Sequence, residues 1–212
     1  MNQRYESHLF WGKFSPLTSL MGLGLIVLAS GRFAFALICT GALIWVYLFT
    51  AVVYSNARKL MPEKGRKIIL LFLSTFLCGI LMFLFSLINP LMVLGSWFFL
   101  ILIPPACLGS ALFDDAENIA PAIIIKRAFL EALVLSGIIL AIALIREPLG
   151  MGTLSFPGGI SGIIEVTSDT GSRTVPFRLF SISSGAILLL GYGAAIFSYL
   201  KVKIHGSSGD GR

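Results

Sequence analysis

The chain has 212 residues, of which 57% are hydrophobic and only 12% are charged, with a formal net charge of +6. Soluble domains are about a quarter charged and less than half apolar, so this composition excludes an ordinary water-soluble globular domain. The excess of basic residues lies mainly in short segments between apolar runs, where it is a signal of membrane topology rather than of nucleic-acid binding. All three cysteines lie in apolar runs, which argues against a secreted disulfide framework, and the two histidines near the termini argue against a histidine-rich metal site.

Apolar runs long enough to span a bilayer recur along the chain and predict an all-α, polytopic membrane protein with six transmembrane helices. The first run could mimic a signal peptide, but we interpret it as a first span. It is short and carries Gly22 and Gly24 in its middle, so we expect it to be tilted or partly unwound. The predicted spans cover residues 16–30, 33–54, 67–88, 91–113, 121–145 and 177–200.

The fourth span contains two consecutive prolines, Pro104 and Pro105, followed by Cys107 and Gly109. Each proline removes a backbone donor and clashes with the preceding turn. Because freed carbonyl groups find no partner in lipid, we expect a broken helix here that packs against protein or lines a cavity. Cys107 is then a candidate metal or redox position, and the alternative is a proline-kinked helix with an inert, buried cysteine.

The distribution of basic residues predicts that both termini are cytoplasmic. With six spans and the termini inside, twelve lysines and arginines lie on the inner side and four on the outer side, and residues 146–176 form an outer loop. We assign residues 1–204 to one transmembrane domain and 205–212 to a polar, disordered tail. Pro16 and Pro90 each open a three-span half, which predicts two inverted three-helix repeats with broken helices 1 and 4.

The segment after the fifth span, Ile145-Arg-Glu-Pro-Leu-Gly-Met-Gly-Thr-Leu154, resembles a known signature. It is similar to the Arg-Glu-x-x-Gly-x-Gly-Thr-Leu pattern of the six-span membrane subunits shared by Rnf electron-transport complexes and sodium-translocating NADH:quinone reductases. The resemblance is to the Rnf E / reductase D type. It implies a multi-pass subunit of a prokaryotic plasma (inner) membrane. It also implies as partners a paralogous six-span subunit of opposite orientation, together with flavin- and iron–sulfur-containing subunits and membrane lipid.

The same resemblance implies a cofactor. In the family two paralogous subunits each contribute two cysteines to a shared [2Fe–2S] cluster, which needs four thiolates. Here Gly24 occupies the place of one cysteine, and Cys107 matches the other only with a small deletion. By the family pattern Cys107 is therefore the one candidate metal ligand of this chain. Either a partner supplies the remaining ligands, or there is no cluster and the chain serves as scaffold and ion path.

Three further ionisable residues are candidates for a role in ion movement. Glu131 follows Arg127 by four residues in the fifth span, so an interfacial salt bridge is one interpretation and an ion-path role is the other. Arg146 and Glu147 close the same span, where a structural cap and an ion-path role are both open.

Two classes of function follow. The first is a non-catalytic subunit of a redox-driven, ion-translocating oxidoreductase, in a form that either keeps or has lost the cofactor. The second is the six-span substrate-binding component of a vitamin or metal importer, which fits the size and topology equally well. The signature segment favours the first.

Overall fold

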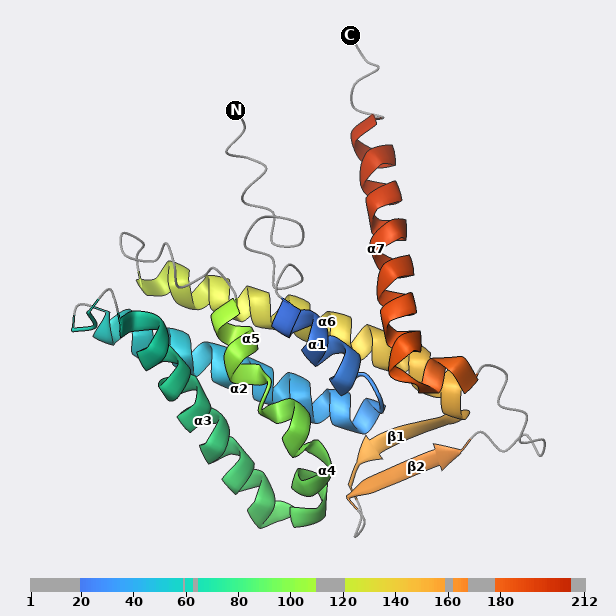
Figure 1. Cartoon of the computed structure of the whole chain (residues 1–212), viewed down its shortest axis with the longest axis horizontal. Coiled ribbons are helices and arrows are strands. Elements are labelled where there is room, and N and C mark those ends of the chain that lie inside the picture. Colours follow the sequence, from blue (N-terminus) through green and yellow to red (C-terminus); the bar gives the residue numbers. More distant parts are fainter. Residues whose placement is uncertain are drawn as a thin grey trace.

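The structure is a computed structural model that describes residues 20–58, 60–62, 65–109, 121–158, 162–167 and 178–206. It is mainly helical, with one two-stranded antiparallel sheet (Figure 1). The elements are α1 (Leu20–Ala29), α2 (Phe33–Ala57), α3 (Arg66–Ile88), α4 (Pro90–Leu100), α5 (Ile103–Gly109), α6 (Pro121–Met151), β1 (Thr153–Pro157), β2 (Ile163–Thr167), the 3-10 turn η5 (Arg178–Ser181) and α7 (Ser183–Gly206).

Four stretches of the described chain are long and apolar enough to cross a membrane, namely α2, α3, the combined α4–α5 stretch Pro90–Leu108, and α6. The apolar part of α7, Ser183–Gly193, is shorter. Side chains on α3 and α4 that would be buried in a water-soluble protein, such as Phe72 and Trp97, are exposed. These features agree with a membrane protein whose outer helices face lipid.

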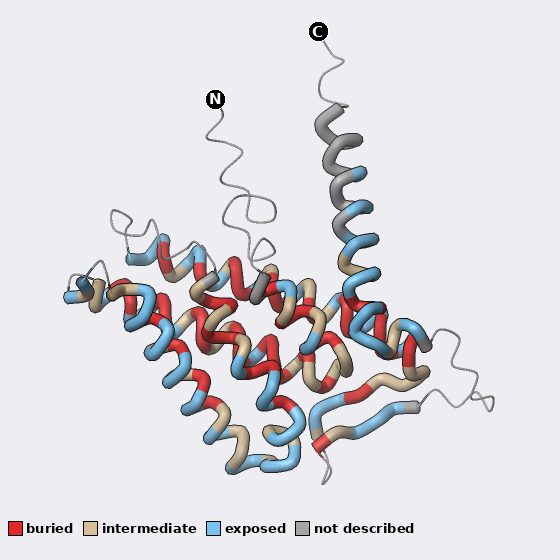
Figure 2. The backbone as a smooth tube through the Cα atoms, in the orientation of Figure 1, coloured by how far each residue is buried: buried red, intermediate tan, exposed pale blue. Residues whose placement is uncertain are grey.

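The centre of the fold is the antiparallel pair α2 and α6 (Figure 1). The short helices α1 and α5 contact each other and pack on this pair, while α3 packs on α2 and α7 packs on the end of α6. Figure 2 shows that buried residues concentrate along α2 and on one side of α6, whereas α3 and the described part of α7 are largely exposed. Thus α2, an apolar helix buried on several sides, is the core element around which the others pack.

The chain turns at Gly31–Arg32, between α1 and α2, and at Asn89–Pro90, between α3 and α4. Asn89 caps α4, because its side-chain oxygen accepts a hydrogen bond from the backbone N–H of Met92 at 3.3 Å. Pro90 occupies the first turn, where its missing N–H costs nothing. An asparagine–proline pair of this kind reverses the chain between α3 and α4.

The predicted break in the fourth span is also confirmed, but it precedes the prolines. Helix α4 ends at Leu100, and α5 begins at Ile103 with both prolines in its first turn, where helices tolerate them. The prolines leave the carbonyl group of Leu100 without its usual helical donor. The Cys78 thiol of α3 donates to that oxygen at 3.3 Å. Cys78 is therefore a hydrogen-bond donor at the break as well as a packed residue.

The break predicted in the first span is wrong for the part of it that the structure describes. Helix α1 runs without interruption through Gly22 and Gly24 from Leu20 to Ala29. Two glycines lower the stability of an isolated helix by about 1 kcal/mol each, but packing on α5 and α6 stabilises this one. At ten residues the described helix is about 15 Å long, or half the thickness of a hydrocarbon core.

The fifth span extends further than the predicted end at Ile145. Helix α6 continues through an exposed Pro148 to Met151, and the next residue, Gly152, has a φ of +70°, the left-handed conformation that glycine favours after a helix end. The backbone N–H of Gly152 donates to the carbonyl group of Pro148 at 3.0 Å. Within the predicted outer loop, the described residues Thr153–Pro157 and Ile163–Thr167 form the antiparallel hairpin of β1 and β2.

The last span begins and ends later than predicted. The 3-10 turn η5 precedes α7, which runs from Ser183 to Gly206 and so includes the first two residues of the predicted tail. The acidic loop around residues 114–118, the predicted interfacial segment 1–14 and the tail residues 207–212 lie outside the described residues.

Candidate functional site

The signature segment at the end of α6 forms a buried, extensively hydrogen-bonded polar site. Arg146 is 3% exposed, and its guanidinium joins α1 to η5. Its Nε donates to the carbonyl oxygen of Phe180 at 2.8 Å and its Nη2 to that of Ser181 at 3.2 Å. Its Nη1 donates to the carbonyl oxygen of Val27 and to Oγ of Ser30, both at 3.1 Å. One arginine therefore supplies donors to the C-terminal end of α1 and to the turn before α7, and so joins the two.

Glu147, the next residue, binds the start of α2. Its Oε2 accepts a hydrogen bond from the backbone N–H of Phe33 at 2.7 Å, and the side chain is 1% exposed. Ser155 of β1 adds a second cap, because its Oγ accepts from the N–H of Ala34 at 3.2 Å. A carboxylate at the positive end of a helix dipole is favourable, and these two side chains pair N–H groups that α2 cannot pair internally.

Glycines allow the close packing around this site. A Cβ atom on Gly150 would lie 2.7 Å from the backbone nitrogen of Ser181, and one on Gly185 would lie 2.6 Å from the carbonyl oxygen of Leu179. These distances exclude any side chain, so α6, η5 and α7 meet backbone against backbone. We call Arg146, Glu147 and Gly150, with the main-chain groups they contact, the junction site.

A surface ion pair holds the hairpin over the junction site. Arg32, in the turn between α1 and α2, donates through Nη1 to Oε1 of Glu165 on β2 at 2.8 Å. Both side chains are partly exposed, at 35% and 48%, so this pair contributes less than the buried bonds of Arg146. On the same hairpin, Phe156 packs edge-on against Phe33 with ring centroids 5.6 Å apart.

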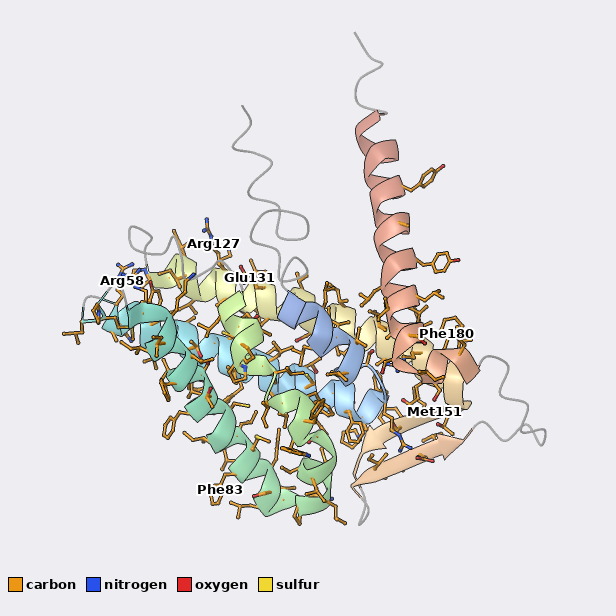
Figure 3. All side chains as sticks on the ribbon, in the orientation of Figure 1. Arg58, Phe83, Arg127, Glu131, Met151 and Phe180 are labelled. Carbon is orange, nitrogen blue, oxygen red and sulfur yellow. The ribbon has the colours of Figure 1, made fainter. Side chains whose placement is uncertain are left out.

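A second polar cluster lies where α2, α5 and α6 meet. Glu131 of α6 is only 6% exposed, and it lies close enough to Tyr47 of α2 and Cys107 of α5 to interact with both electrostatically. The Tyr47 hydroxyl donates to the carbonyl oxygen of Ala106 at 3.1 Å. Figure 3 shows Glu131 on the side of α6 beside α5, while Arg127 projects away from the bundle. Glu131 is therefore in the interior of the protein.

The residues present do not fit a four-thiolate cluster. Cys107 is fully buried beside a carboxylate and a tyrosine, and Gly24 has no side chain to contribute. Within the described ranges, no three histidine, cysteine, aspartate or glutamate side chains come together as a metal site. Cys39 and Cys78, which lie in apolar runs of the sequence, are buried.

Arg146, Glu147 and Glu131 were predicted from the sequence as candidate site residues, but the groups that they contact were not. Ser155, Tyr47 and the carbonyl groups near residues 27 and 180 carry no sequence signal, because they become neighbours only after folding. No protein-family model and no curated protein matches this sequence.

Proposed function

We propose that the chain is an integral subunit of a redox-driven, ion-translocating complex of the Rnf/NADH:quinone reductase type, in which it acts as scaffold and ion path. The observation that carries this proposal is the junction site. Arg146, Glu147, Gly150 and Gly152 are the residues through which the chain resembles that family, and each has a distinct structural role. A segment in which each of these residues has a defined structural role is a stronger link than hydropathy alone.

The arrangement of the helices gives further support to the proposed inverted repeat. The two central helices α2 and α6 are antiparallel, α2 packs on α3 as α6 packs on α7, and α2 contacts α5 as α6 contacts α1. Two halves related by an axis in the membrane plane would produce this pattern of contacts. In such proteins ions bind near the interface between the halves, which here is the α2–α6 pair with its buried Glu131.

We assign no cluster ligand to this chain. A thiol shared with a partner must reach the surface that the partner contacts, whereas Cys107 is 0% exposed within its own chain. Substitution of Cys107 by alanine should therefore leave the iron content and the EPR signal of the assembled complex unchanged. Cys39→Ala, which also removes a fully buried thiol, is the matched control for packing effects on assembly.

The proposal is tested by purifying the tagged chain from its native membranes in a mild detergent and identifying the proteins that accompany it. We expect a second six-span subunit together with flavin- and iron–sulfur-containing subunits. Recovery with the nucleotide-binding subunits of an importer would refute the proposal.

A further inference from the structure

The β1–β2 hairpin has one apolar side and one mainly polar side. On one side of the sheet the register brings together four apolar side chains, namely Leu154, Phe156, Ile164 and Val166. We call these four residues the apolar face. Ser155 and Glu165 are paired on the other side, and Glu165 is the one charged residue among the described residues of the hairpin. The hairpin is therefore amphipathic.

The two sides are arranged in the reverse of the order found in a water-soluble protein. In such a protein the apolar side of a sheet packs on the core and the polar side meets water. Here the polar side contacts the protein, because Ser155 caps α2 and Glu165 pairs with Arg32. Three side chains of the apolar face are 40%, 50% and 55% exposed, namely Phe156, Ile164 and Val166. Exposed apolar surface of this kind marks contact with a membrane or with another apolar surface.

The length of α6 places the hairpin at the membrane boundary. Lys126 and Arg127 are exposed near the start of α6, where basic side chains anchor a helix at the lipid headgroups. From Arg127 to Met151 the helix is about 36 Å long at 1.5 Å per residue, against about 30 Å for a hydrocarbon core. Met151 and the hairpin that follows it therefore lie about 6 Å beyond the core, at the depth of the headgroups.

The hairpin also adjoins the lipid-facing surface of the bundle. At its tip a Cβ atom on Gly162 would lie 3.2 Å from Met92, so the hairpin reaches the start of α4 (Figure 1). Beside Met92, Leu91 and Leu94 are 56% and 71% exposed, and α4 belongs to a stretch apolar enough to cross a membrane. Lipid that covers this part of α4 is therefore adjacent to the hairpin, which favours lipid over a partner protein as the cover of the apolar face.

We propose that the apolar face of the hairpin is inserted into the lipid leaflet at this end of α6, where it contacts acyl chains just below the headgroups. The polar side, which contacts the start of α2, is turned away from the lipid. An amphipathic element binds a membrane interface in this way, through its buried apolar area. The hairpin then anchors the junction site at the membrane surface, because Ser155 and Glu165 connect it to α2 and to the turn before α2. The inference does not depend on the proposed function.

Fluorescence quenching on the full-length chain in lipid nanodiscs tests this position. Single cysteines are introduced on the apolar face, as Ile164→Cys and Val166→Cys, and labelled with the fluorophore NBD. The matched controls on the polar side are Glu165→Cys and Thr153→Cys, of which the second keeps the ion pair of Glu165 with Arg32. The three native cysteines are buried, so the wild-type chain gives the background. Lipids with a nitroxide on the upper acyl chain quench a label in the leaflet, whereas dithionite bleaches a label in water.

We expect the labels on the apolar face to be quenched severalfold more strongly by the nitroxide lipid than the two controls, and to be protected from dithionite. Equal access of dithionite to all four positions would overturn the insertion and leave the apolar face to a partner protein. Equal quenching by lipid at all four would also overturn it, because the two sides would then not differ. Val166 with Glu165 and Ile164 with Thr153 are independent comparisons, so a single misfolded variant does not prevent a decision. Because the isolated chain is used, the result is separate from membership of a redox complex.

Discussion

Replacement of Arg146 by alanine should be among the most destabilising single substitutions in the chain. Four hydrogen bonds from its guanidinium would be lost, to Val27, Ser30, Phe180 and Ser181. At about 1 kcal/mol for each bond, the free energy of unfolding should fall by about 4 kcal/mol. For a chain of this size that corresponds to a decrease in Tm of about 8–16 °C. Arg146→Lys should recover only part of the loss, because an ammonium group cannot reproduce the planar fork.

Thermal unfolding in detergent, followed by circular dichroism, measures this effect. Arg32→Ala is the matched control, since it removes an arginine from the same region that makes one partly exposed ion pair, worth less than about 1 kcal/mol. If Arg146→Ala lowers Tm by no more than Arg32→Ala, the junction site does not hold α1 and η5 together, and our interpretation of the signature segment fails.

The remaining predictions concern packing and backbone hydrogen bonds. Gly150→Ala should lower Tm severely, because its Cβ would meet the backbone nitrogen of Ser181 at 2.7 Å, whereas Gly137→Ala, whose Cβ would meet nothing within 4 Å, should leave Tm unchanged or raise it. Equal effects of the two substitutions would contradict the close approach of η5 to α6. Cys78→Ala should cost about 1 kcal/mol through loss of the bond to the Leu100 carbonyl group, and Cys78→Ser, which restores a donor, should be milder in chemical unfolding. A serine variant as unstable as the alanine variant would mean that packing, not the hydrogen bond, matters there.

Local chemistry explains which parts of the fold could be predicted from the sequence. Asn89 is a favoured N-cap residue and Pro90 a favoured first residue of a helix, so the turn and the start of α4 could be predicted from these two residues alone. The broken fourth span could likewise be predicted from Pro104 and Pro105. The exact position of the break could not, because prolines are accepted in a first helical turn and mark where α5 starts rather than where α4 stops.

The residues of the junction site could be identified from the sequence, but the contacts that they make could not be predicted. The partners of Arg146 lie more than thirty residues away in η5 and more than a hundred away in α1. No periodicity links such positions, and three of the four acceptors are main-chain carbonyl groups that any sequence could supply. The extension of α6 past Ile145 was missed for a related reason. Pro148 argues for a helix end, but the bonds of Arg146 and Glu147 hold the helix in place around it.

The central claim, that this chain takes part in redox-driven ion movement, is tested most directly by ion uptake into inverted membrane vesicles. Vesicles from cells that lack the chain are compared with vesicles from the same cells carrying the wild-type chain, with NADH as the reductant and radioactive Na⁺ or a pH-sensitive dye as the readout. We expect NADH-driven uptake that requires the chain and is abolished by Glu131→Gln but retained in Glu165→Gln. Uptake that is equal with and without the chain, for both ions, would contradict the claim.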